Sequence, residues 1–310
     1  MTDNDVLEIR DQLWDVHPVI REKAILPTPA LKNVISLVWS LARKARGSIA
    51  FFARPLSGKS SCAKVLRSEM QRKNPGCGVV ILEVVEEDRN PAEGRLLSEI
   101  LNQIDYALPI LRDLAGKRTQ VHRALFAKSG NARHLFLIFD EAQEISAKEF
   151  AWLKAIINRL VRDDVAVTVV LFGQEELKQS KDRLKSARSD LEIRFMDHLY
   201  ELRGLQGVGE LRSILESVDS KSEYPDESGI SYTQFLLPRF FGAGKRLEAL
   251  SDHMWKCLNR LRRPGRDKDV PISIFAAFLA ALCIKLRYLD APELEITDEI
   301  LDSIVVSHKS

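Results

Sequence analysis

Short runs of apolar residues alternate along the first two thirds of the chain with longer segments in which apolar positions recur every three or four residues. The short runs are Ser48–Phe52, Gly78–Val85, His134–Phe139, Val165–Phe172 and His198–Leu202. Their length and composition predict buried strands. Between them, residues 147–162 place Phe150, Leu153 and Ile157 at helical spacing. Strands that alternate with helices predict a parallel sheet covered on both faces.

After about Val208 the strand pattern stops and only helical periodicity remains. Helices are expected near 208–218, 231–238, 244–262, 272–287 and 297–306. An amphipathic helix is also expected to begin at Thr28 or Pro29. We therefore expect an N-terminal arm over 1–24, an α/β domain over 25–206 and a small all-helical domain over 207–310.

Composition is that of an ordinary globular protein, with 45% hydrophobic and 29% charged residues among 310. The net charge of +2 argues against an overall basic coat for nucleic acid, although a local basic stripe stays open. The four cysteines form no C-x-x-C pair, which is typical of a reducing compartment. The longest apolar stretch, 272–284, is too short to span a bilayer. We expect a cytoplasmic protein with no membrane partner.

The segment Ala53–Ser60 matches the phosphate-loop pattern G-x-x-x-x-G-K-[ST] except at its first position, where Ala53 replaces glycine. It lies between a predicted strand and a predicted helix, as that motif requires. Backbone amides at a helix start attract phosphate, Lys59 adds a full charge, and the Ser60 hydroxyl can hold Mg²⁺. The expected nucleotide-binding residues are Arg54, Pro55, Leu56, Ser57, Gly58, Lys59, Ser60 and Ser61. The alternative is a simple helix cap, and Ala53 could weaken nucleotide affinity.

Two acidic residues, Asp140 and Glu141, follow the third predicted strand directly. At the carboxyl end of that strand, Asp140 is expected to complete the magnesium shell with Ser60, while Glu141 can orient and polarise an attacking water. Such a pair implies ATP hydrolysis with Mg²⁺, and not passive nucleotide storage. Two solvated loop acids are the alternative.

At this point the chain resembles the AAA+ ATPases, and within them the bacterial transposition regulators TniB and TnsC, with ExeA-type ATPases as neighbours. The resemblance runs from about Thr28 to Leu250. It rests on ARPLSGKSS, HLFLIFDEAQEIS, VTVVLFGQEEL, LEIRFMDHLYEL and FFGAGKRLEAL. It implies a P-loop NTPase of α/β class, with a parallel five-stranded sheet flanked by helices and followed by a helical lid domain.

The resemblance also implies further site residues. Gln174 takes the position of a polar sensor that helps to place the lytic water, and a plain turn residue is the alternative. Arg194 matches an arginine finger that reaches a neighbouring subunit, or else is a surface arginine paired with Glu192 or Asp190. Arg246 matches a lid arginine that closes over the phosphates, with Lys245 or an ordinary solvated helix start as the alternatives. Adenine contacts are expected from the segment 25–27, which comprises Ile25, Leu26 and Pro27.

The function that the resemblance implies is ATP-dependent regulation of DNA transposition. Such a protein assembles with ATP on double-stranded DNA as a homo-oligomeric ring or filament. Its protein partners are a transposase, which it directs to the target, and target-selection proteins. Candidate DNA contacts are Arg89, Arg95, Lys117, Arg118 and Arg123, which a solvated helical face explains equally well. The second basic stretch, 258–268, is either an exposed helix end and loop or a contact for DNA or a transposase. The alternatives are a signalling or defence NTPase and a nucleotide-binding scaffold that does not hydrolyse ATP.

Overall fold

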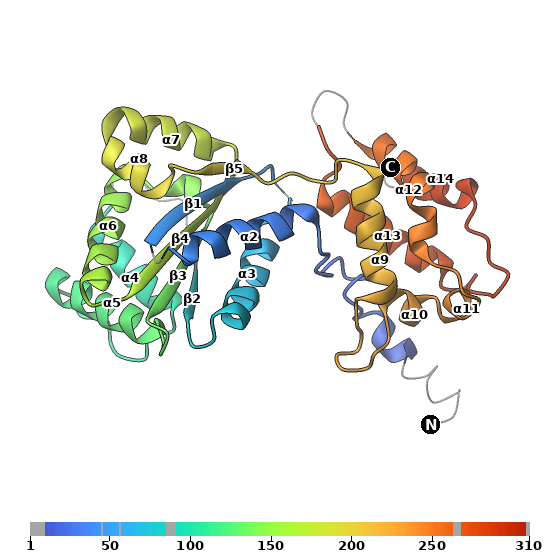
Figure 1. The fold of residues 1–310 in the computed structure, drawn as a ribbon, viewed down its shortest axis with the longest axis horizontal. Helices are drawn as coiled ribbons and strands as arrows, with labels where there is room; N and C mark the ends of the chain where they lie inside the picture. Colours follow the sequence, from blue (N-terminus) through green and yellow to red (C-terminus); the bar gives the residue numbers. More distant parts are fainter. Residues whose placement is uncertain (1–9, 45, 56, 85–90, 263–267, 308–310) are drawn as a thin grey trace. The chain divides into compact units, whose positions relative to one another are not determined.

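The computed structural model describes residues 10–44, 46–55, 57–84, 91–262 and 268–307. It divides into two compact units, one formed by 32–202 and the other by 1–31 together with 203–310. Figure 1 shows the sheet of the first unit and the helices of the second. Each unit has its own hydrophobic core.

The first unit is built on a five-stranded, all-parallel sheet in the order β2-β3-β4-β1-β5. The strands are β1 (Arg46–Phe52), β2 (Gly78–Glu83), β3 (His134–Asp140), β4 (Ala166–Gly173) and β5 (Leu199–Glu201). The register pairs Phe52 with Gly173 and Glu83 with Asp140. Strand β4 therefore lies between β1 and β3, and the last residues of these strands share one edge of the sheet.

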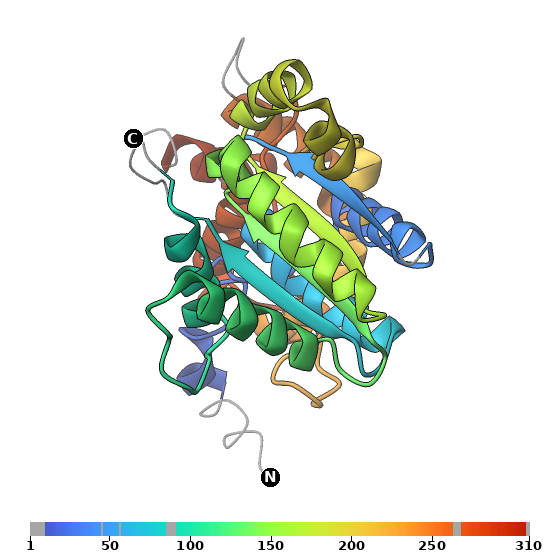
Figure 2. The same ribbon diagram turned by 90° about the vertical axis from the view of Figure 1, so that its left-hand side faces the viewer.

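Alternation of side chains along the strands creates two apolar faces, because successive residues of a strand point to opposite sides. Ala50, Phe52, Leu137 and Leu171 belong to one continuous core. Helices α4 (Glu93–Gln103), α5 (Leu114–Lys128), α6 (Ala147–Arg162), α7 (Glu176–Ala187) and α8 (Ser189–Phe195) contribute to that core. Helices α2 (Pro29–Ala42) and α3 (Lys59–Lys73) lie on the opposite face, as Figures 1 and 2 show from two directions.

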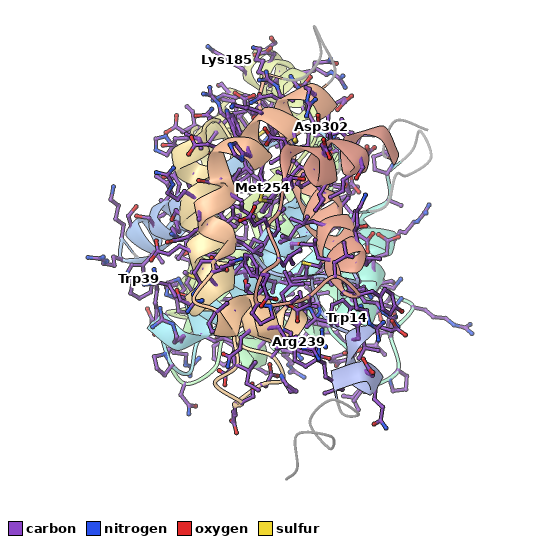
Figure 3. All side chains as sticks on the ribbon, turned by 90° about the vertical axis from the view of Figure 1, so that its right-hand side faces the viewer. Trp14, Trp39, Lys185, Arg239, Met254 and Asp302 are labelled. Carbon is purple, nitrogen blue, oxygen red and sulfur yellow. The ribbon has the colours of Figure 1, made fainter. Side chains whose placement is uncertain are left out.

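The second unit is helical. It comprises α9 (Val208–Ser220), α10 (Tyr232–Leu236), α11 (Pro238–Gly242), the 3-10 turn η2 (Leu247–Leu250), α12 (Ser251–Leu261), α13 (Ile272–Leu286) and α14 (Asp298–Ser307). Met254 of α12 is fully buried among these helices, whereas Asp302 lies on α14 at their surface (Figure 3). None of the helices in the described ranges is long and apolar enough to cross a membrane.

Two helices expected in this unit are shorter than the periodicity predicts. The helix expected over 231–238 breaks at Leu237 into α10 and α11, because Pro238 has no amide hydrogen and disfavours helical geometry in the residue before it. The helix expected from residue 244 starts at Ser251. Gly244 adopts a left-handed φ of 81° and Arg246 is extended, so the backbone becomes helical only after them.

The N-terminal segment packs with the helical unit, which differs from the expected division into 1–24, 25–206 and 207–310. Trp14, Val19 and Leu26 are buried in the core of that unit. His17 stacks on Phe235 at 5.1 Å between ring centroids, and burial lowers the pKa of its imidazole to about 4. These apolar side chains find their partners about 200 residues further along the chain, which a boundary drawn from local composition does not detect.

A glycine at the start of β2 permits a close approach that a side chain would prevent. A Cβ atom on Gly78 would lie 1.7 Å from the carbonyl oxygen of Lys128, at the end of α5. Gly78→Ala is therefore expected to lower the free energy of unfolding by about 2 kcal/mol or more, because backbone must move. The matched control is Gly94→Ala in α4, whose added Cβ meets its nearest atom at 3.8 Å. Urea denaturation of both variants tests this, and equal midpoints would contradict it.

Candidate functional site

The predicted phosphate loop, acidic pair and sensor residue all follow strands that end at the same edge of the sheet. The loop from Ala53 follows β1, Asp140 ends β3, and Gln174 follows β4. Carboxyl ends of parallel strands, next to helix starts, are where α/β sheets bind ligands. The strand order thus brings together side chains that are 33 to 80 residues apart in sequence.

The phosphate loop has the backbone that its glycine allows. Gly58 adopts φ 84° immediately before α3, and open space surrounds the position of a Cβ on it. Ala53, in contrast, keeps a negative φ, is buried, and donates its amide to the Gly173 carbonyl at 3.0 Å. The replacement of the first motif glycine by alanine therefore causes no backbone strain at this position.

Lys59 and Ser60 begin α3 beside the acidic end of β3. Lys59 as a whole residue is only 6% exposed. Its Nζ lies 3.4 Å from the Arg54 carbonyl oxygen. The Ser60 hydroxyl donates to Asp140 Oδ2 at 2.6 Å. The first two residues of α3 thus supply a cation for phosphate and, through the hydroxyl–carboxylate pair, oxygen ligands for a metal.

The pair formed by Ser60 and Asp140 fits magnesium by its chemistry. Mg²⁺ prefers oxygen ligands and is usually held by one or two carboxylates, with phosphates and waters in its remaining positions. Among the described residues, no group of three or more His, Cys, Asp or Glu side chains could hold a metal ion. Asp140 and Ser60 would therefore hold Mg²⁺ together with a nucleotide's phosphates, and not as an independent metal site.

Glu141 has an unusual backbone conformation, and two amide side chains hold its carboxylate. Its φ of 55° is left-handed, a conformation that costs a non-glycine residue about 1–2 kcal/mol. Gln143 Nε2 and Gln174 Nε2 both donate to Glu141 Oε2, at 2.7 and 3.0 Å. Burial is the largest single influence and opposes ionisation. The two hydrogen bonds and the charge of Lys59 together outweigh it and lower the pKa of Glu141. Glu141 is thus an ionised, oriented carboxylate.

Gln143 is a site residue that sequence reasoning missed. Its Oε1 accepts a hydrogen bond from the backbone N–H of Gln174 at 2.8 Å. Its Nε2 donates to Glu141 and, at 3.2 Å, to Glu144. A Cβ on Gly173 would lie 2.9 Å from Gln143 Oε1, so this glycine makes room for the carboxamide. The signal available in the sequence was the glutamine two positions after Glu141, in Asp140-Glu141-Ala142-Gln143.

The remaining loop residues lie around this centre. Arg54 Nε is 3.8 Å from Glu175 Oε1, which links the phosphate loop to the residue after Gln174. Ser57 donates its hydroxyl to the Arg54 carbonyl at 2.7 Å. Pro55 is in the exposed turn, and Ser61 is an exposed residue in the first turn of α3. Leu56, also expected to bind nucleotide, lies outside the described residues.

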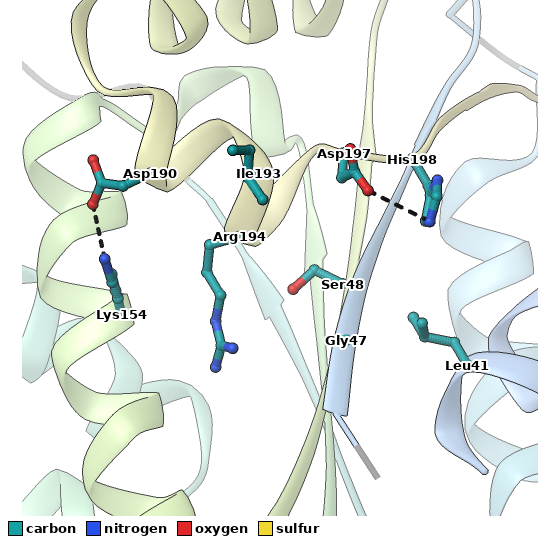
Figure 4. Close-up of a pocket in the computed structure, with 9 residues that line it drawn as sticks. All are labelled: Leu41, Gly47, Ser48, Lys154, Asp190, Ile193, Arg194, Asp197 and His198. Atoms are coloured by element: carbon teal, nitrogen blue, oxygen red, sulfur yellow. Dashed lines mark hydrogen bonds and ion pairs between the residues drawn. The ribbon is translucent and has the colours of Figure 1, made fainter. Parts of the chain in front are cut away.

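Arg194 is not part of the cluster around Asp140. It points from α8 into a hollow of about 390 Å³ that Gly47 and Ser48 of β1 also line (Figure 4). Those two residues are at the amino end of β1, so the hollow lies at the sheet edge opposite the phosphate loop. Of the two acids named as alternative partners, Asp190 lies 2.8 Å from Lys154 and Glu192 lies 3.3 Å from Lys181.

The expected lid and adenine contacts belong to the helical unit. The Arg246 guanidinium lies over the Phe241 ring, 3.6 Å from its centroid, and Nη1 donates to the Lys245 carbonyl at 2.7 Å. Lys245 Nζ donates to the Leu294 carbonyl at 2.7 Å. Leu26 is buried in the core of this unit, whereas Ile25 is 56% exposed. The roles expected for these residues stay predictions.

Several cations expected to contact DNA have partners inside the α/β unit. Arg118 donates to both carboxylate oxygens of Glu93 at 2.6 Å, and Arg95 pairs with Glu99 at 3.3 Å. Lys117 Nζ donates to the Ser98 hydroxyl at 2.8 Å. In the second basic segment, Arg260 pairs with Asp302. Arg89 and residues 263–267 lie outside the described residues. Arg95 therefore pairs within α4, whereas Lys117 and Arg118 of α5 bind residues of α4.

Comparisons with known proteins identify the fold. Residues 42–180 match the family model of an AAA domain. The Aeropyrum pernix ORC2 protein in ADPNP–ADP complexes is similar in structure, with a TM-score of 0.60 and 16% identity, over 95% of this chain and 72% of that chain. Its ADP form is similar with a TM-score of 0.56 and 16% identity, over 93% of this chain and 71% of that chain. Drosophila ORC bound to DNA is similar with a TM-score of 0.50 and 10% identity, over 100% of this chain and 68% of that chain. No curated protein sequence matches the chain.

At these identities the structural likeness shows the fold alone. The predicted fold class is confirmed: a P-loop AAA+ fold, with a five-stranded parallel sheet, flanking helices and a helical C-terminal region.

Proposed function

We propose that the chain is a magnesium-dependent AAA+ ATPase. The single observation that carries the proposal is the convergence of two pairs at one sheet edge: Ser60 with Asp140 at 2.6 Å, and Glu141 with Gln174 at 3.0 Å. The first pair has the ligand chemistry of a nucleotide-bound metal. The second holds a carboxylate where it can orient a water molecule. Neither arrangement is needed to cap a helix or to solvate a loop.

The chain's own residues divide the work between binding and hydrolysis. Lys59 and the amides around Gly58 bind the β- and γ-phosphates. Ser60 and Asp140 would hold Mg²⁺, which would supply charge neutralisation at those phosphates. Glu141 orients the attacking water and accepts its proton, and its low pKa keeps it ionised for that role. Gln174 and Gln143 fix the carboxylate. Arg194, which lies away from this cluster, acts from one subunit on the site of the next.

The finer proposal is that this ATPase regulates DNA transposition. With ATP it assembles on double-stranded DNA as a ring or filament and directs a transposase, and hydrolysis then disassembles the complex. The support is the ordered set of motifs shared in style with the transposition regulators, from ARPLSGKSS to FFGAGKRLEAL. The likeness in fold to an ORC assembly bound to DNA is compatible with this proposal.

Sedimentation and ATPase measurements on the full chain test both levels of the proposal. We expect Mg²⁺-dependent ATP turnover that duplex DNA stimulates, and assemblies that form only when ATP and DNA are both present. Turnover without any ATP-linked DNA binding at low salt would leave the ATPase but contradict the assembly on DNA. A complete lack of turnover would contradict the ATPase.

Gly173→Ala is expected to slow turnover without weakening nucleotide binding. The new methyl group would displace the Gln143 carboxamide, so Glu141 would lose one of its two amide donors. A misplaced catalytic group typically costs about 10- to 100-fold in rate. Steady-state kinetics with a parallel nucleotide titration measure the effect, and Gln143→Ala should reproduce it. An unchanged rate in both variants would remove Gln143 from the mechanism.

A further inference from the structure

A second charged pocket lies at the opposite edge of the sheet from the phosphate loop. It has a volume of about 450 Å³ and is formed by α5, the end of α6 and the residue before β3. Its lining residues are His122, Arg123, Phe126, Arg133, Arg159 and Asp163. Arg133 precedes the first residue of β3, whereas Asp140 is the last. The pocket is therefore separated from the proposed nucleotide site by the length of the strand.

The positive charge of this pocket is not balanced by neighbouring acids. Residues 114–139 contain five lysines and arginines and no acidic residue, in a chain whose net charge is only +2. Asp163 is the one acid among the lining residues, and its Oδ2 lies 2.7 Å from His122 Nε2. Within the described ranges, no carboxylate pairs with Arg123, Arg133 or Arg159, unlike Arg118 and Arg95 nearby. Three guanidinium groups thus face one acid.

Arg133 is held over the pocket by packing and backbone geometry. Its φ of 49° is in the left-handed region, which is uncommon for a long side chain, and its guanidinium lies 4.1 Å from the centroid of Phe126. This cation–π contact fixes the guanidinium plane on the ring while its N–H groups stay available at the edge. The Arg133 carbonyl accepts the Ala166 amide at 2.8 Å, so the residue is anchored to the sheet. The pocket therefore has at least one preorganised donor.

The donor set indicates which chemistry the pocket would bind. Guanidinium forks match the tetrahedral oxygens of phosphate, and unpaired arginine clusters are a recurrent way to recognise phosphate. With three arginines against one acid, the pocket favours a ligand of more than one negative charge. We propose that this pocket binds phosphate groups, supplied either by the backbone of a nucleic acid or by a free polyphosphate. The proposal does not depend on ATP binding or hydrolysis at the phosphate loop.

The nucleic-acid source is tested with a fluorescent 30-base-pair duplex, titrated by anisotropy against the full chain without nucleotide at several salt concentrations. Arg133→Gln/Arg159→Gln is expected to weaken binding at least tenfold and to reduce the slope of log affinity against log salt by about 0.9 for each phosphate that the variant no longer neutralises. The matched control is Arg72→Gln/Arg212→Gln, whose arginines pair with Glu69 and Asp252. It carries the same change in net charge and should bind within twofold of the wild type.

Binding of a free polyphosphate is tested by calorimetric titration of inorganic pyrophosphate. Each variant is placed in a Lys59→Ala background, which removes the ammonium of the phosphate loop. Binding that is abolished in the pocket variant and kept in the control assigns the site to free polyphosphate. Arg123→Gln, an exposed residue outside the strained turn, is a second variant in case the double substitution perturbs folding. If neither duplex nor pyrophosphate distinguishes the pocket variants from the control, the proposal is overturned.

Discussion

Glu141→Gln should reduce ATP turnover by roughly 10²- to 10⁴-fold, the range typical of a lost general base, while nucleotide binding is retained. The substitution keeps the size of the side chain but removes the charge that orients water and accepts its proton. The wild-type carboxylate has two amide donors and a lowered pKa, so it is ionised throughout the neutral range. Glutamine in its place cannot accept the proton, whereas its carboxamide oxygen can still accept from both amide donors.

Single-turnover kinetics and a nucleotide titration separate the two effects of this substitution. The control is Glu176→Gln, which makes the same change in charge on an exposed residue at the start of α7 and should turn over as the wild type does. Equal rates for Glu141→Gln and wild type would mean that Glu141 is not the base. Near-zero rates for both would favour a nucleotide-binding scaffold.

Lys59→Ala is expected to weaken nucleotide affinity by tens- to thousands-fold. Removal of one partner from a buried charge pair typically costs about 2–5 kcal/mol, and Lys59 is 6% exposed. The loss arises because the phosphate charge then has only backbone amides and the metal to compensate it. The affinity for ATP should fall more than the affinity for adenosine, which carries no phosphate.

A fluorescent ATP analogue measured by anisotropy gives this affinity directly. Lys64→Ala is the matched control, since it removes an exposed lysine from the same helix, α3, and is expected to change affinity less than twofold. A Lys59→Ala variant that binds within threefold of the wild type would contradict the role of the ammonium group.

The parts of the fold that depend on local pattern were predictable from the sequence. Apolar runs indicated the five strands, and the loop around Gly58 with the acids at 140 and 141 indicated which strand ends had to meet. A strand pattern shows neither the left-handed φ of Glu141 nor the room that Gly173 leaves for Gln143. Both depend on how the turns after β3 and β4 pack together.

Contacts between residues far apart in the sequence explain the other differences between the predicted and the observed structure. Trp14 and Leu26 are buried by residues near the other end of the chain, so the N-terminal segment has no local signature of its unit. Arg118 is a candidate for DNA in sequence, but Glu93, 25 residues earlier, holds it with two hydrogen bonds. Charge in a sequence shows what a surface carries. Only the fold shows which of those charges already have partners.

The most direct test of the central claim is the binding of Mn²⁺, a spectroscopic substitute for Mg²⁺, measured by electron paramagnetic resonance with and without ATP. If Ser60 and Asp140 hold the metal of a nucleotide bound at Lys59, the wild-type chain should bind about one Mn²⁺ only when ATP is present, and Asp140→Ala should bind it far more weakly. ATP-independent Mn²⁺ binding, or equal ATP-dependent binding by wild type and Asp140→Ala, would contradict the account.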